Sequence, residues 1–141
     1  MVVEIIKKIK CIMAKFIQLQ TFLSEKGSLT VFEKILQNGI KRIFYIYNAE
    51  NQERGGHRHK LAHNALTCVS GSCKVYINDG ERERIYELDS PEKCLLLEPQ
   101  DWHTMYDFST GAVLLVLSDR NYEKEDYIYE KYAESVEFEL A

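Results

Sequence analysis

Residues 54–71 read RGGHRHKLAHNALTCVSG, and this stretch holds three of the four histidines in the chain within seven positions. In a β-strand, side chains two residues apart point to the same face of the sheet. If the stretch is extended, His57, His59 and His63 therefore all project to one side. Imidazoles that face one cavity indicate proton transfer or metal binding.

Short runs of β-branched and aromatic residues lie on both sides of this stretch, separated by Gly, Asn, Asp and Ser. Such regularly spaced runs predict an all-β sandwich or barrel. Residues 70–72 and 78–80 are predicted hairpin turns, because their residue types tolerate the positive φ that such turns require. The expected strands cover residues 16–22, 28–35, 42–48, 62–69, 73–79, 84–89, 94–99 and 111–118.

The two ends of the chain lack this pattern of short strands separated by turns. Residues 121–135, NYEKEDYIYEKYAES, carry acidic residues near their start and tyrosines at roughly helical intervals, which predicts a short C-terminal helix packed on the barrel. Residues 1–14 have apolar residues at helical spacing and predict either an N-terminal helical extension or a segment upstream of an alternative start at Met13. We expect one domain over residues 1–141.

The composition excludes several classes of protein. A chain of 141 residues with 45% hydrophobic content is large enough to bury one core, and a net charge of -4 argues against nucleic acid as the main partner. The sequence shows neither a membrane span nor a signal peptide. The four cysteines form no CxxC pair and are expected to be reduced thiols, which predicts a cytoplasmic protein.

The ordered segments of the chain resemble a known family. RGGHRHKLAHNALTCVSGSCKV (54–75), EPQDWHTMYDFSTGAVLLVLSD (98–119) and EDYI (125–128) closely resemble the dTDP-sugar 3,4-ketoisomerases of the WxcM-like cupin group. EKGSLTVFE (25–33) and IKRIFYIYN (40–48) are also similar, so the resemblance runs from about Phe16 to about Tyr132. The specificity lies in the order and spacing of these segments rather than in one motif.

The resemblance implies a small cupin jelly-roll barrel, usually a homodimer that exchanges strands. It implies an enzyme that acts without metal or other cofactor on dTDP-4-keto-6-deoxyglucose and moves the keto group from C4 to C3. Such enzymes serve the synthesis of 3-amino-3,6-dideoxyhexoses. The family commonly has HAH followed by HQ, so Arg58 and Asn64 are departures in this chain. Arg58 should point away from the face shared by the histidines, whereas Asn64 could alter a polar contact in the pocket.

The proposed chemistry suits histidine. Moving a carbonyl to the neighbouring carbon needs a base for the C3 proton, a donor to the C4 oxygen and a proton returned to C4 through an enediol. Histidine titrates near neutral pH and can fill both roles. We assign His59 as the base and His57 as the group that polarises or protonates the enediolate oxygen, and the sequence alone could support the exchange of these two roles.

Other residues are candidates for binding the rest of the substrate. Arg42 and Arg54 suit the pyrophosphate, since guanidinium groups match phosphate oxygens, although each could instead form a surface salt bridge. Tyr45, Tyr47 and Tyr106 could stack on thymine or donate to the sugar, or belong to the core. Lys26 and His103 are candidates for setting the face on which C4 is reprotonated, and their basic character favours the galacto product.

Two other functions remain open from the residues alone. His57, His59 and His103 could form a site for Zn, Fe, Ni or Mn in a metal-dependent cupin enzyme. Metal-binding cupins usually have Glu at the position of Asn64, and the amide supplies no negative charge. The second alternative is a non-catalytic module that binds sugar nucleotides, which would lose no chemistry when His57 or His59 is replaced. The assignment that we favour has no metal ligands.

Overall fold

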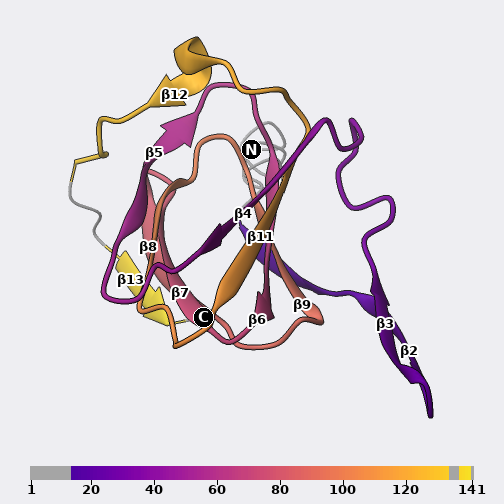
Figure 1. Ribbon diagram of the computed structural model, residues 1–141. Coiled ribbons are helices and arrows are strands. Elements are labelled where there is room, and N and C mark those ends of the chain that lie inside the picture. Colours follow the sequence, from indigo (N-terminus) through magenta and orange to yellow (C-terminus); the bar gives the residue numbers. More distant parts are fainter. Residues whose placement is uncertain (1–13, 134–136, 141) are drawn as a thin grey trace, which may run out of the picture.

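The computed structural model describes residues 14–133 and 137–140, and almost all of its regular structure is β-strand. Two mostly antiparallel sheets face each other and enclose the core (Figure 1). The first sheet has, in spatial order, β1 (Lys15–Gln18), β9 (Lys93–Leu97), β6 (Asn64–Ser70), β11 (Val113–Ser118) and β4 (Arg42–Tyr47). The second has β12 (Tyr127–Ile128), β5 (Arg54–His59), β10 (Trp102–Tyr106), β7 (Cys73–Asn78), β8 (Arg82–Leu88) and β13 (Glu137–Leu140). This architecture confirms the predicted all-β barrel.

The core lies between the sheets and consists of the inward-facing residues of both. Leu66, Val75, Leu88, Leu95 and Leu114 are each at most 1% exposed. Burying a side chain of this size contributes about 1.5–3 kcal/mol, so these layers supply much of the stability. They fill one part of the barrel with apolar groups and leave polar side chains to gather in the other.

The two central hairpin turns lie where the sequence predicts them. β6 ends at Ser70 and β7 begins at Cys73, with Gly71 at φ 70°. An added Cβ at Gly71 would come within 2.9 Å of the Cα of Ala112, so both the backbone angle and the space require glycine. The next turn places Gly80 at φ 96° between β7 and β8. These turns fix the registers of β6, β7 and β8.

The predicted C-terminal helix is wrong. Between Asn121 and Ala133 the chain forms only a three-residue 3-10 turn, η1 (Lys124–Asp126), followed by β12, which pairs with the end of β5. The tyrosines of this segment contact the barrel in different ways, and Tyr127 packs against the rings of His57 and His59. These tertiary contacts outweigh the weak helical pattern. The predicted N-terminal helix concerns residues 1–13, which lie outside the described part of the chain.

One element projects away from the barrel. β2 (Gln20–Ser24) and β3 (Gly27–Val31) form a separate two-stranded hairpin that extends from the body of the molecule (Figure 1). Its side chains Phe22, Leu23 and Leu29 are 54%, 76% and 59% exposed. Within the described residues, no helix is long and apolar enough to cross a bilayer.

Candidate active site

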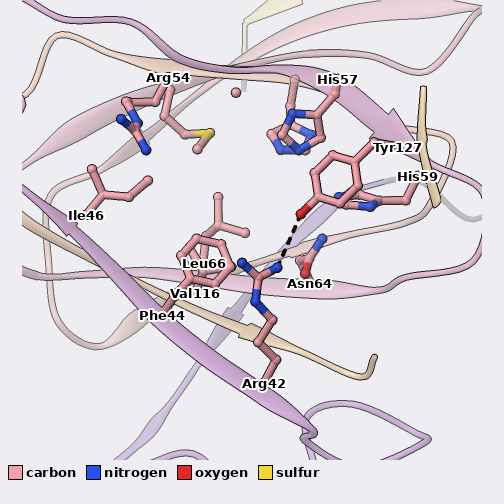
Figure 2. Close-up of a pocket in the computed structure, with 13 residues that line it drawn as sticks. Arg42, Phe44, Ile46, Arg54, His57, His59, Asn64, Leu66, Val116 and Tyr127 are labelled. Atoms are coloured by element: carbon pink, nitrogen blue, oxygen red, sulfur yellow. Dashed lines mark hydrogen bonds between the residues drawn. The ribbon is translucent and has the colours of Figure 1, made fainter. Parts of the chain in front are cut away.

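A cavity of about 210 Å³ lies between the two sheets, where β5 and β10 face β4 and β6. Its walls combine apolar side chains with imidazole, guanidinium, amide and phenol groups (Figure 2). Its lining residues are Arg42, Phe44, Ile46, Arg54, Gly55, His57, His59, Asn64, Leu66, His103, Met105, Val116 and Tyr127. An apolar cavity with a few convergent polar groups is typical of a site for a small molecule.

Three imidazoles meet in this cavity because of the pairing of β5 with β10. His57 and His59 lie two residues apart on β5 and both line the cavity, and His103 on β10 lies opposite His57. The ring centroids of His57 and His103 are 4.9 Å apart, those of His57 and His59 5.1 Å, and those of His59 and His103 6.3 Å. The pairing shifts register between His103, which lies opposite His57, and Thr104, which lies opposite Gly55.

Gly55 makes the close approach of the two strands possible. Its φ is 89°, and a Cβ at this position would lie 2.8 Å from the carbonyl oxygen of His103. A side chain here would push β10 away from β5 and separate the imidazoles. The glycine before the histidines in the sequence is therefore part of what builds the cluster.

Asp126 orients the imidazole of His59. Its Oδ2 lies 2.9 Å from Nδ1 of His59, and its Oδ1 accepts a hydrogen bond of 2.8 Å from the backbone N–H of Leu61. A carboxylate at Nδ1 accepts a hydrogen bond from the N–H of that nitrogen, so the proton stays on Nδ1 and Nε2 carries the lone pair. Burial alone would raise the pKa of Asp126, but the N–H of Leu61 and the His59 ring outweigh burial and lower it.

The three imidazoles favour their neutral forms. Burial, followed by the charge of His59, lowers the pKa of His57 to about 4. Burial and the neighbouring His57 lower the pKa of His103 to about 3. Burial also lowers the pKa of His59, but the hydrogen bond and negative charge of Asp126 oppose this effect. At neutral pH the cluster therefore offers neutral nitrogens, and His59 is the one whose protonated form has a carboxylate beside it.

Arg42 and Arg54 line different parts of the cavity. Nη1 of Arg42 donates a hydrogen bond of 3.2 Å to the hydroxyl oxygen of Tyr127, and its guanidinium carbon lies 4.5 Å from the ring centre of Phe44. In Figure 2 the guanidinium of Arg54 lies across the cavity from this pair. Arg42 thus contacts the histidine cluster through Tyr127, whereas Arg54 lies apart from it.

Most of the predicted site residues line this one cavity, and some do not. Arg42, Arg54, His57, His59, Asn64 and His103 all do. Tyr45 is 61% exposed on β4, as is its neighbour Tyr47 at 58%, and Tyr106 lines a separate shallow hollow beside Trp102. Lys26 lies in the exposed turn of the β2–β3 hairpin. The structure therefore does not bring these four residues to the cavity within one chain.

His63 does not share the face of His57 and His59, so that prediction is wrong. β5 ends at His59, and the chain turns before β6 begins at Asn64. Nδ1 of His63 lies 3.0 Å from Asp119 and Nε2 lies 3.1 Å from Glu98. Sequence spacing alone could not find this difference, because the alternation of faces holds only as long as the strand continues.

Sequence reasoning also missed two residues of the site. Asp126 and Tyr127 belong to the EDYI segment, which carries the family resemblance but was expected to be helical. The pairing of Tyr127 with His59 between β12 and β5 brings both residues to the cavity. The signal that could have identified them was the acidic–aromatic pair itself, since an unpaired imidazole base needs a partner to orient it.

No metal site is evident in the residues described. Within residues 14–133 and 137–140, no group of three or more His, Cys, Asp and Glu side chains has an arrangement that could hold a metal ion. Nδ1 of His59 faces Asp126, and Nδ1 of His103 lies 2.9 Å from the backbone oxygen of Asp101. Asn64 lines the cavity without adding a negative charge.

Comparison with known proteins gives consistent results. The chain is 36% identical over 133 residues to a TDP-4-oxo-6-deoxy-α-D-glucose-3,4-oxoisomerase of Aneurinibacillus thermoaerophilus. The alignment covers 89% of this chain and 96% of that protein. The structure matches QdtA, a sugar 3,4-ketoisomerase of Thermoanaerobacterium thermosaccharolyticum solved with TDP, with a TM-score of 0.79 and 37% identity over 83% of this chain and 88% of that one.

A second structural relative is WlaRB, a TDP-quinovose 3,4-ketoisomerase of Campylobacter jejuni, with a TM-score of 0.79 and 34% identity over 83% of this chain and 92% of that one. The family model described as FdtA, WxcM-like, C-terminal, matches residues 13–137. The match to the family model includes the whole histidine cluster. The chain therefore belongs to the FdtA family of WxcM-like proteins, whose solved relatives are sugar 3,4-ketoisomerases.

Proposed function

We propose that this protein is a dTDP-sugar 3,4-ketoisomerase that converts dTDP-4-keto-6-deoxyglucose to its 3-keto isomer without a metal. The observation that carries the proposal is the cluster of neutral imidazoles in one cavity, with Asp126 2.9 Å from Nδ1 of His59. A nitrogen base held by a carboxylate is the arrangement that proton abstraction next to a carbonyl requires. The relatives named above, which catalyse this class of reaction, support it.

In this mechanism His59 is the base. Its Nε2 accepts the proton from C3, and the imidazolium that forms is stabilised by Asp126. The electrons of the C3–H bond form the enediolate, and His57 donates a hydrogen bond to one of its oxygens. His59 then returns a proton to C4. Because His57 and His59 are only 5.1 Å apart, both rings can reach a pair of adjacent sugar carbons.

The remaining polar groups of the cavity would hold the substrate. Arg54 lies apart from the imidazoles and is the better placed of the two arginines for the diphosphate, while Arg42 is bonded to Tyr127 within the cluster. Asn64 is 6% exposed, lines the cavity beside these groups and suits a sugar hydroxyl. His103 is suited to act at the C4 face, because its ring lies 4.9 Å from that of His57, and we favour the galacto product.

We further propose a homodimer in which the β2–β3 hairpin packs on the partner. An isolated hairpin is barely stable in water, and this one exposes Phe22, Leu23 and Leu29. β4 is the edge strand of its sheet, and its outward residues Ile43, Tyr45 and Tyr47 are 58–61% exposed. An exposed apolar edge of this kind favours pairing with another chain. The exchange would carry Lys26 to the partner and away from its own barrel.

Light scattering coupled to gel filtration tests the dimer. We expect the mass of two chains for the wild type and a shift to one chain for Leu23→Asp, because a charge would be buried at the interface. Lys26→Asp, in the same exposed turn but without an apolar contact to lose, is the matched control. A wild-type protein with the mass of one chain at micromolar concentration would contradict the proposal.

The decisive experiment for the activity is proton NMR of dTDP-4-keto-6-deoxyglucose incubated in D2O with EDTA-treated protein. We expect a 3-keto product that carries deuterium at C4, and the H4–H5 coupling constant of the product formed in a parallel incubation in H2O assigns the C4 configuration. Activity that returns only on addition of a divalent metal would show a metal-dependent cupin enzyme instead. Binding without turnover would show a sugar-nucleotide-binding module.

The proposed reaction also predicts the enzyme that uses the product and the location of the protein. A 3-keto sugar is the substrate that an aminotransferase needs to make a 3-amino-3,6-dideoxyhexose, so such an enzyme should consume the product. A cytoplasmic location would fit this proposal, because the buried cysteines Cys68, Cys73 and Cys94 are free thiols.

A further inference from the structure

Tyr127 lies at the centre of the cluster without a role in the mechanism above. The pairing of β12 with β5 sets it opposite His59, and its ring centre is 4.7 Å from those of both His57 and His59. In Figure 2 its hydroxyl points into the cavity toward Arg42. A phenol placed between two imidazoles and beside a cation is unusual for a residue that only fills space.

The hydrogen bond with Arg42 defines what this hydroxyl can do. A guanidinium has only donors, so in the 3.2 Å contact the phenol oxygen accepts the hydrogen of Nη1. The hydroxyl proton of Tyr127 is not used in that bond and remains available for another acceptor. If that proton leaves, the phenolate is already beside a positive charge. The pair is therefore arranged as a proton donor with a counter-ion.

The chemistry of the isomerisation requires such a donor. When the C3 proton is removed, negative charge develops on the C4 oxygen, and this charge must be neutralised for the enediol to form. His57 and His103 favour their neutral forms, since burial lowers the pKa of His57 to about 4 and that of His103 to about 3. A neutral imidazole can donate a hydrogen bond but transfers its remaining proton poorly.

We propose that Tyr127 is the catalytic acid of this site, the group that protonates the sugar oxygen, with Arg42 as its counter-ion. This inference rests on the proposed ketoisomerase function. Geometry supports it independently of charge, because the Tyr127 ring is equally close to the ring of the base, His59, and to that of His57, which contacts the enediolate oxygen.

The proton balance closes with one acid and one base. His59 takes the proton of C3, the C3–C4 double bond forms, and the C4 oxygen takes the proton of Tyr127 to give the neutral enediol. In the second half, the phenolate takes the proton of the C3 hydroxyl, the C3 carbonyl forms, and C4 takes the proton from His59. The two oxygens of a planar enediol are neighbours, so one phenol serves both. Both residues return to their starting states.

Tyr127→Phe tests this role, because it removes only the hydroxyl. We expect kcat to fall about 10²- to 10⁴-fold, the range for loss of a general acid, with KM and the Kd for TDP changed by less than about threefold. Tyr129→Phe is the matched control, since its ring is 6.2 Å from that of Tyr127 and the residue is 64% exposed outside the cavity. The control should keep wild-type kcat.

A second variant separates acid catalysis from a structural role. Replacing Tyr127 with 2,3-difluorotyrosine keeps the hydroxyl and makes it more acidic. A general acid works only while protonated, so the alkaline limb of kcat should move to lower pH in the fluorinated variant. This variant also decides the matter if Tyr127→Phe does not fold.

The outcomes distinguish the two proposals. Wild-type protein that does not isomerise the sugar overturns the ketoisomerase function and this role with it. Wild-type turnover together with a Tyr127→Phe variant within about threefold of it overturns only the role of Tyr127. An alkaline limb that does not move in the fluorinated variant overturns that role as well.

Discussion

His59 and His63 lie four residues apart in the same segment, yet their surroundings give them opposite uses. His59 is 7% exposed, has one nitrogen against Asp126 and directs its ring into the cavity. The side chain of His63 is 39% exposed and has a carboxylate at each nitrogen, Asp119 at 3.0 Å and Glu98 at 3.1 Å. Among the described residues, the first imidazole has a hydrogen-bond partner at Nδ1 alone, whereas both nitrogens of the second are engaged.

The comparison shows what makes a histidine suitable for catalysis in this fold. A neutral imidazole has one donor and one acceptor nitrogen, so a base needs a partner on one side only. With a carboxylate on each side, the ring of His63 links three segments: it lies just before β6 and contacts Glu98 after β9 and Asp119 after β11. The residue type is the same, and the number of partners determines the role.

The strongest test of this comparison is His59→Asn. We expect turnover to fall by about 10³-fold or more, because the base is lost, while TDP still binds. Steady-state kinetics and calorimetric titration with TDP measure the two effects separately. His63→Asn is the matched control and should isomerise the sugar at close to the wild-type rate. Wild-type activity in His59→Asn would contradict our assignment of the base.

His57→Asn should have the next largest effect. We expect kcat to fall about 10²-fold, because an amide can still donate a hydrogen bond to the enediolate but places it differently. Exchange of the C3 proton in D2O, followed by NMR, identifies the step. If His57→Asn abolishes this exchange and His59→Asn retains it, the roles of the two histidines are reversed.

The sequence was sufficient for the barrel and for most of the cavity. The turns at Gly71 and Gly80 were predictable because few residues other than glycine adopt their positive φ, and His57 and His59 share a face because β5 continues through both. Asp126 and Tyr127 were not predicted as site residues, since their place depends on the pairing of β12 with β5, and no local pattern encodes a contact 67 residues away.

Asp126→Asn tests the contrast by weakening the hydrogen bond at Nδ1 of the His59 ring. We expect kcat to fall about 10-fold to 10²-fold, since an amide does not stabilise the imidazolium. Asp126 raises the pKa of His59 against the effect of burial, so its removal should lower that pKa further. A base acts when unprotonated, so activity is lost as the pH falls through this pKa, and the acid limb of kcat should move to lower pH.

The control for Asp126 is the corresponding change at the other histidine, Asp119→Asn. It removes the charge beside His63 in the same way. The charge of Asp119 raises the pKa of His59 less than the hydrogen bond and charge of Asp126 do, so the acid limb of kcat should move much less than in Asp126→Asn. An acid limb that stays in place in Asp126→Asn, or one that moves as far in Asp119→Asn as in Asp126→Asn, would contradict the assignment of His59 as the titrating base.

The smallest effect is expected for His63→Gln, and it should appear in stability rather than in catalysis. One side chain would lose its bonds to Asp119 and Glu98, and because the His63 side chain is 39% exposed, solvent screens these interactions. We expect the free energy of unfolding to fall by about 1 kcal/mol, measured by urea denaturation, with kcat unchanged. A large loss of kcat at unchanged stability would mean that His63 takes part in the reaction and that a carboxylate at each nitrogen does not exclude an imidazole from catalysis.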